Sequence, residues 1–164
     1  MKRVWLLIPV IAALAACSTT RPDAPDAGLT PSAPVPVAGL DWHLSEDTTE
    51  TKLAFGRANS DDLRLALTCV PGSGTLGLLQ TTVKPGSEIH LESGGDTERF
   101  ATRVEPAGVH EGDLLTAEAR TDAPVFQRFR RLGWLASWDG GTREVMVAHP
   151  ASTASVDRFF AVCG

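Results

Sequence analysis

Tyrosine is absent from this sequence of 164 residues, which also has only two methionines and three cysteines. Any aromatic binding surface must therefore be built from its four tryptophans and six phenylalanines. An excess of basic residues is missing too, because 15 Lys and Arg stand against 20 Asp and Glu, a formal net charge of −5. Nucleic acid is not an expected partner, since its binders usually concentrate positive charge on one surface.

The sequence motifs of common catalytic and metal centres are also missing. The chain contains no G-x-S-x-G, H-E-x-x-H or C-x-x-C motif. Its histidines, His43, His90, His110 and His149, are scattered and never stand at the spacing of metal ligands. The sequence therefore predicts no cofactor, no metal site and no catalytic residue. A non-enzymatic protein is favoured, and the alternative is a hydrolase whose site is assembled from residues distant in the chain.

Long apolar runs are limited to the N-terminus. Lys2 and Arg3 form a short positive head, and the apolar run Val4–Leu14 follows. This run is too short to span a bilayer as a mature helix. The segment Leu14-Ala15-Ala16-Cys17 comes next. Small residues before a cleavage site mark a secretory signal peptide, and a cysteine directly after them resembles the lipobox of bacterial lipoproteins.

The lipobox resemblance implies a mature protein that is held to a membrane by lipid. Residues 1–16 would be removed as the signal peptide, and Cys17 would carry the acyl chains, which anchor a protein stably when several are present. Removing residues 1–16 takes away two basic residues and no acidic one, so the mature charge is near −7. Ser18 follows the cysteine where inner-membrane lipoproteins often carry Asp. We therefore expect a bacterial envelope protein in the outer membrane, facing the periplasm.

A Pro/Ala-rich segment, residues 17–38, separates this anchor from the rest of the chain. Five prolines stand in it among Ala, Ser, Thr and Asp, without apolar periodicity. Proline fixes φ and removes a hydrogen-bond donor, so such a segment stays extended, at about 3.1 Å per residue in polyproline II form. The sequence thus predicts a flexible tether over 17–38 and a single globular domain over 39–164.

The domain is expected to be organised around the segment Leu63–Val70. Its leucines and Cys69 alternate with smaller or polar residues, the period-two pattern of a half-buried strand. Turn-forming residues stop it at Pro71. Similar short strands, separated by glycine- and proline-rich turns, are predicted over 40–44, 52–55, 75–83, 88–92, 99–105, 114–120, 134–138 and 144–148.

Two late segments have apolar residues at helical spacing instead. In the first, residues 125–132, proline at 124 and glycine at 133 mark the two ends. In the second, 156–163, Ser152 or the residue after it is expected to cap the helix. The fold class predicted is mainly β, an antiparallel sandwich or small open barrel with two short helices, the last at the C-terminus. The absence of regular β-α alternation excludes a doubly wound sheet.

Two cysteines remain once Cys17 is assigned to lipid. Cys69 and Cys163 form an even pair in an oxidising compartment, which favours a disulfide. The alternatives are two buried free thiols or one reactive thiol. A reactive thiol would need a base close by, and neither cysteine has a histidine near it in sequence.

One cluster suggests a binding surface. Arg128, Arg130 and Arg131 precede Trp134 and Trp138, and together they could bind anionic glycan or lipid phosphates. The alternative is a helix that exposes its charges while the tryptophans enter the core.

A second segment suggests an inhibitor. Glu92-Ser93-Gly94-Gly95 resembles the Ser-Gly loop of small lipoproteins that inhibit C-type lysozyme, although the aromatic and lysine positions expected after it are not matched. The favoured function is a lipid-anchored, non-enzymatic binding or scaffolding module with an envelope protein or glycan as partner. The alternative that this resemblance implies is an inhibitor of a cell-wall-degrading enzyme.

Overall fold

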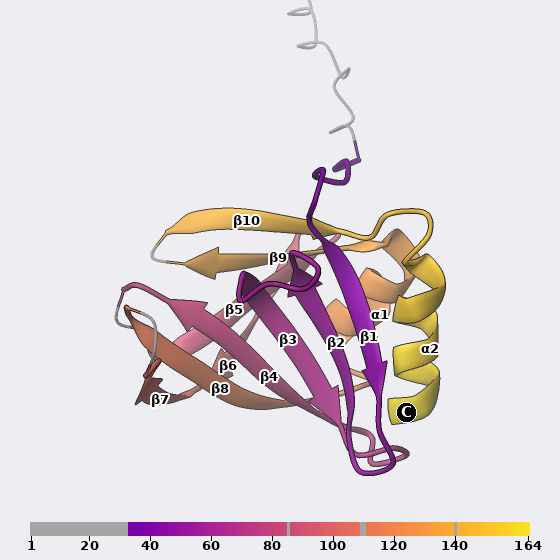
Figure 1. Cartoon of the computed structure of the whole chain (residues 1–164), viewed down its shortest axis with the longest axis horizontal. Helices are drawn as coiled ribbons and strands as arrows, with labels where there is room; N and C mark the ends of the chain where they lie inside the picture. The colour runs from indigo at the N-terminus through magenta and orange to yellow at the C-terminus, as the bar shows by residue number, and fades with distance from the viewer. Residues whose placement is uncertain (1–32, 85, 109–110, 140) are drawn as a thin grey trace, which may run out of the picture. The chain divides into compact units, whose positions relative to one another are not determined.

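The computed structural model describes residues 33–164 apart from residues 85, 109, 110 and 140. In this part of the chain ten strands form two antiparallel sheets, and two helices come late (Figure 1). The elements are β1 (Asp41–Glu46), β2 (Thr51–Gly56), β3 (Leu63–Cys69), β4 (Thr75–Thr82), β5 (Glu88–Ser93), β6 (Asp96–Ala101), β7 (Arg103–Pro106), β8 (Asp113–Arg120), α1 (Pro124–Leu132), β9 (Trp134–Asp139), β10 (Thr142–Val147) and α2 (Thr153–Cys163).

The larger sheet has the order β1-β2-β3-β4-β8-β7, and the smaller has the order β10-β9-β5-β6. Neighbouring strands are antiparallel throughout both sheets. The predicted fold class is confirmed, with two antiparallel sheets that do not close into a barrel and a helix at the C-terminal end. The segment expected to be central, β3, pairs with β2 on one side and β4 on the other.

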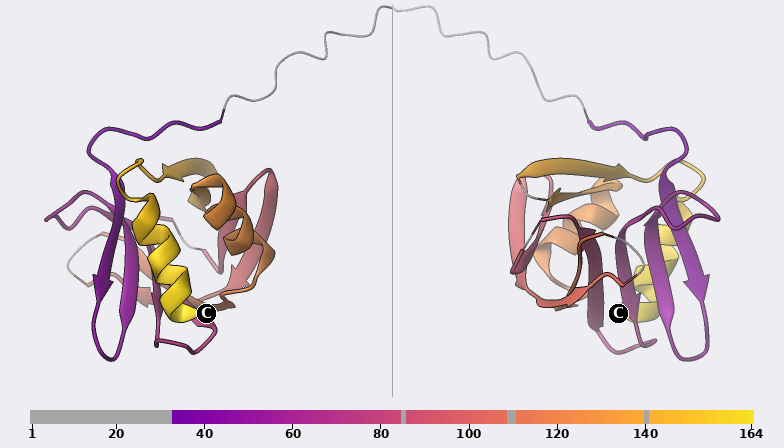
Figure 2. Two further views of the ribbon diagram at one scale, coloured as in Figure 1. Left: turned by 90° about the vertical axis from the view of Figure 1, so that its right-hand side faces the viewer. Right: turned by 60° about the vertical axis from the view of Figure 1, so that its left-hand side comes forward.

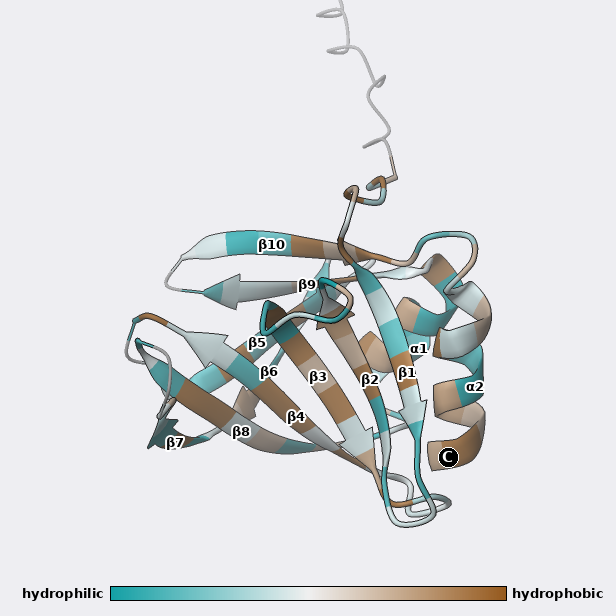
Figure 3. Ribbon diagram, in the orientation of Figure 1, coloured by the Kyte–Doolittle hydropathy of each residue, from teal (hydrophilic) through white to brown (hydrophobic). Residues whose placement is uncertain are grey.

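The core lies between the inward faces of the sheets and the two helices. Leu65 and Leu67 of β3 are fully buried there with Leu76 and Leu78 of β4, as the alternation predicts. Figure 3 shows hydrophobic residues concentrated along the middle strands of the larger sheet and a hydrophilic β7 at its edge.

The two helices fill the side where the sheets diverge. In the left view of Figure 2 they lie side by side between the β1–β2 hairpin and the β5–β6 hairpin. Phe129 of α1 joins the layers, because its ring lies 4.9 Å from that of Trp42 in β1 and 6.1 Å from that of Phe160 in α2. The helices are thus part of the core rather than an addition to a finished β domain.

The ends of the helices only partly follow the sequence signals. Pro124 stands in the first turn of α1, and Gly133 follows with φ 73°, its N–H donating to the Phe129 carbonyl at 2.8 Å. The first turn of α1 is capped from another element, because Val125 N–H donates to Glu98 Oε1 of β6 at 2.8 Å. Ser152 does precede α2, but its side chain makes no capping bond.

The predicted strand 99–105 is wrong in one respect, since the chain crosses between sheets within it. β6 ends at Ala101 in the smaller sheet, and β7 begins at Arg103 in the larger one. Thr102 lies between them, and its N–H leaves the strand ladder to donate to Ser87 O at 3.0 Å. The alternation of the sequence, with Phe100, Thr102 and Val104 on one side, continues across this residue, so the period-two pattern cannot reveal the switch.

Candidate functional site

The predicted signal peptide and the acylation site Cys17 lie outside the described residues, as does most of the tether. Residues 33–38 of the tether are described and have no helix or strand. Among the described residues, no helix has the length and apolar character needed to cross a bilayer.

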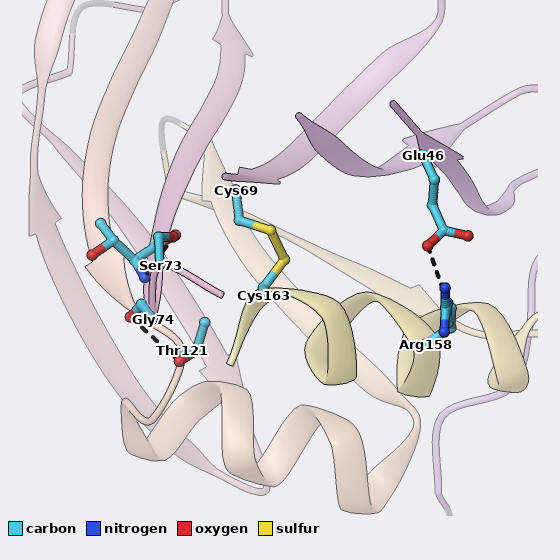
Figure 4. Close-up of a disulfide and its surroundings, with 8 residues drawn as sticks. Glu46, Cys69, Ser73, Gly74, Thr121, Arg158 and Cys163 are labelled. Atoms are coloured by element: carbon cyan, nitrogen blue, oxygen red, sulfur yellow. Dashed lines mark hydrogen bonds and ion pairs between the residues drawn. A yellow bond between two sulfur atoms is a disulfide. The ribbon is translucent and has the colours of Figure 1, made fainter. Parts of the chain in front are cut away.

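The pair Cys69 and Cys163 joins the end of β3 to the end of α2 (Figure 4). Their Cα atoms are 5.7 Å apart, a separation suited to a disulfide, across 94 residues of sequence. The turn after β3 also holds the helix end, because Gly72 N–H donates to Val162 O and Gly74 N–H to Cys163 O, each at 2.8 Å. Since both cysteines are buried and bridged, this region is structural and offers no free thiol for chemistry.

The three arginines predicted as a binding surface have different environments on α1. Arg128 is held by the β5–β6 turn, with Nε donating to Ser93 O at 2.7 Å and one Nη to Asp96 O at 3.2 Å. Its side chain is only 16% exposed. Arg130 lies over the Phe160 ring at 5.4 Å, and Arg131 is exposed. Only Arg130 and Arg131 therefore remain available to a ligand.

The two tryptophans of the predicted surface lie on the opposite side of the smaller sheet from α1. β9 directs Leu135 and Ser137 into the interior, where the buried face of α1 packs, so Trp134 and Trp138 point outward. The structure consequently places both tryptophans on one face of β9, away from the α1 arginines.

A different arginine, Arg143 of β10, accompanies the tryptophans. It lies opposite Trp138 in the hairpin register and over the Trp134 ring at 5.6 Å. It also forms a bidentate ion pair with the Glu92 carboxylate of β5, with N–O distances of 2.6 and 2.8 Å. The Glu92 hydrogen bonds raise the pKa of Arg143 above its ordinary value. The sequence could have indicated this neighbour of the tryptophans. The Asp139-Gly140-Gly141 turn signal predicts a hairpin, and pairing across that hairpin sets Arg143 opposite Trp138.

A groove of about 800 Å³ lies over the outward face of the larger sheet and is called here the sheet-face groove. Two rows of cross-strand partners form its floor. One row runs from Lys52 through Thr68 and Gly77 to Glu118, and the next includes Ala66, Leu79, Thr116 and Arg103.

Small residues keep the floor of this groove low. A Cβ on Gly77 would lie 2.7 Å from the Thr68 hydroxyl oxygen, so glycine is needed beside that threonine. Ala66 is almost completely buried by its neighbours. Thr102, in the link between the sheets, also lines the groove, and its buried hydroxyl has no hydrogen-bond partner among the described residues.

The rim of the sheet-face groove carries charges of both signs. Lys52 stands on the β2 side, and Arg103 and Glu118 stand on the β7–β8 side. All three are exposed, and within the described part of the chain none of them forms an ion pair or a side-chain hydrogen bond. These charges are therefore free to pair with a ligand. The sequence does not identify them, because a single charged residue on a strand is no motif for a binding site.

The Ser-Gly turn, considered above as an inhibitor loop, is held against α1. Ser93 is fully buried, and its hydroxyl donates to Trp134 O at 2.9 Å. A Cβ on Gly94 would lie 3.0 Å from a Leu132 methyl carbon. The serine would have to leave its position in the fold to enter another protein's active site.

Neither metal-ligating side chains nor similarity to known proteins indicates a further site. Within the described ranges, no group of three His, Cys, Asp or Glu side chains is arranged to hold a metal ion. Comparison with known proteins found no matching family model, no similar curated protein and no similar solved structure.

Proposed function

We propose that this protein is a lipid-anchored component of the bacterial cell envelope, attached to the outer membrane through Cys17. Its domain binds a partner protein and catalyses no reaction. The lipobox-like segment supports the anchor, and the sheet-face groove supports the binding role.

The observation that carries the binding role is the combination of floor and rim in this groove. Gly77 lowers the floor where an extended segment would lie, and the rim offers Lys52, Arg103 and Glu118 without partners in the described part of the chain. Because both signs of charge are present, the partner segment is expected to carry both as well. The groove volume of about 800 Å³ is within the range of ligand sites.

Lipidation is tested first by mass. The protein extracted from membranes should weigh more than the chain starting at residue 17 by the mass of its acyl chains. The Cys17→Ala variant should lack that mass and leave the membrane fraction, because the thiol is the point of attachment. If the parent protein and the Cys17→Ala variant each have the mass of their polypeptide alone, the lipid anchor is refuted.

The sheet-face groove is tested by charge reversal on the full-length, tagged protein. Lys52→Glu combined with Arg103→Glu should reduce the amount of a partner recovered after mild crosslinking in envelopes by about tenfold or more, since reversed rim charges repel what they attracted. The partner is identified by mass spectrometry. If it is an enzyme, an assay of its activity would show whether this protein inhibits it.

The matched control is Arg130→Glu combined with Arg131→Glu, because it changes net charge by the same amount on α1. This variant should recover the partner normally. If it loses the partner while the groove variant keeps it, binding belongs to the α1 surface and the groove proposal is wrong. Recovery of glycan or lipid without protein would also contradict it.

A further inference from the structure

The unpaired charges of the sheet-face groove have a defined spacing, because they stand on strands of one sheet. Lys52 of β2 and Glu118 of β8 belong to one row of cross-strand partners, with Thr68 and Gly77 between them. Three strand spacings separate the two charged residues, since the sheet order here is β2-β3-β4-β8. At about 4.8 Å for each spacing, their Cα atoms lie about 14 Å apart.

Arg103 continues this series by one strand. It pairs with Thr116, which is two residues before Glu118 on the same face of β8, so Arg103 of β7 is the diagonal neighbour of Glu118. Such diagonal neighbours lie about 7–8 Å apart. No ion pair joins these two residues within the described ranges, so neither neutralises the other. The charges along the groove are thus positive, negative and positive, at intervals of about 14 Å and about 7 Å.

An extended peptide reproduces these intervals. Its side chains on one face recur every second residue, about 6.8 Å apart, so residues i, i+4 and i+6 are separated by about 14 Å and about 7 Å. All three side chains point to the same side, because the spacings are even. Thr68 and Gly77, which stand between Lys52 and Glu118, are too short to hold such a peptide away from the sheet.

Glu50 sets the direction in which a peptide with an acidic residue over Lys52 would run. Glu50 lines the groove two residues before Lys52, and it has no ion pair in the part of the protein that is described. It lies on the opposite side of the charged row from Arg103, because the pairing that advances from Lys52 toward the end of β2 advances from Glu118 toward Thr116. Repulsion from Glu50 therefore favours a path toward Arg103.

We propose that the sheet-face groove binds an extended segment of its partner with an acidic residue at i over Lys52, a basic residue at i+4 beside Glu118 and a second acidic residue at i+6 beside Arg103. This inference rests on the binding function proposed above and adds the charge pattern that the partner must carry. A segment with the three charges inverted meets like charges at every position and is rejected.

The test measures peptide binding to the full-length protein in detergent at low salt, by fluorescence anisotropy. The labelled probe is Ser-Asp-Thr-Ser-Thr-Lys-Thr-Asp-Ser, and a second peptide has Asp and Lys exchanged at the three charged positions. The parent protein should bind the first peptide about tenfold or more tightly than the second. A third peptide with Lys moved to i+3 should bind about threefold or more weakly than the first, because that side chain points away from the sheet.

A variant that combines Lys52→Glu, Arg103→Glu and Glu118→Lys should reverse this preference, binding the inverted peptide about tenfold or more tightly than the first. All three side chains are exposed, so the variant should unfold at the same temperature as the parent. If it unfolds at a lower temperature, Glu118→Lys alone serves as the test and should reduce the preference about threefold or more. The matched control, Arg130→Gln combined with Arg131→Gln, changes net charge equally on α1 and should keep the parent's preference.

The inference is overturned if the first peptide shows no saturable binding, if the parent binds the three peptides equally, or if the charge-reversed variant keeps the parent's preference. A reversal in the α1 control would overturn it as well. The proposed function is judged separately, by the recovery of the partner from envelopes. If Lys52→Glu with Arg103→Glu loses the partner while the peptide preference is absent, the groove binds its partner without this charge pattern. If that variant keeps the partner, the proposed function itself is wrong.

Discussion

Cys69→Ser and Cys163→Ser should each lower the free energy of unfolding by about 4–5 kcal/mol, and by the same amount. A cross-link over 94 residues of sequence removes much of the conformational freedom of the unfolded chain, and the chain-entropy relation gives about this value for such a loop. Domains are typically stable by only about 5–15 kcal/mol. Either variant should therefore unfold in far less urea than the parent, as measured by tryptophan fluorescence.

The structure adds a local reason for this large effect. The bridge fixes the end of α2 beside the turn that donates N–H bonds from Gly72 and Gly74 to the last carbonyls of that helix. Losing the bridge should release α2 first, so hydrogen exchange in α2 should rise more than in β4.

The third cysteine supplies the matched control. Cys17→Ala should leave the unfolding free energy of the domain unchanged in detergent, because Cys17 lies outside the part of the sequence predicted to fold. Unequal losses for Cys69→Ser and Cys163→Ser would contradict the pairing. Two thiols titrating in the native exported protein would contradict it as well.

Phe129→Ala should destabilise the domain by about 3–5 kcal/mol. Its ring is completely buried where α1, β1 and α2 meet, against Trp42 and Phe160. Truncating such a ring loses its transfer free energy and leaves a cavity that rigid neighbours cannot fill. Urea unfolding gives the value, and the near-ultraviolet circular dichroism of the packed tryptophan should weaken as well.

Leu132→Ala is the control on the same helix. Leu132 is 43% exposed, so its truncation should cost less than about 1 kcal/mol. A loss similar to that of Phe129→Ala would contradict core burial as the cause of the large effect, because alanine favours a helix at least as well as leucine. A small loss for Phe129→Ala would instead show that the two helices do not share the core with the larger sheet.

The order of strands and helices follows from local patterns, and most of it was predictable. Leu65, Leu67 and Cys69 alternate with smaller or polar residues, which specifies a strand with one buried face before any partner is known. Pro124 and Gly133 bound α1 because proline fits the first turn and glycine tolerates positive φ. The pairing of Cys69 with Cys163 followed from counting cysteines once the third was assigned to lipid.

Three features depend on residues that only the fold brings together. The change of sheet at Thr102 leaves the alternation of the sequence intact, so no local pattern marks it. The capping of α1 by Glu98 comes from 27 residues earlier in the chain, and no cap motif spans such a distance. The tryptophans face away from α1 because a strand directly after a helix directs alternate side chains to opposite sides of the sheet.

The candidate binding sites show the same division. The sequence by itself determined the chemical character of the chain: a lipobox-like start, a proline-rich spacer, an acidic β-rich domain and one pair of cysteines. Only the tertiary structure decided which charges lack partners, because strand pairing between distant segments places Lys52 and Glu118 along the same groove. Burial and hydrogen bonding are properties of the neighbours in space, so neither can be read from a residue and its neighbours in sequence.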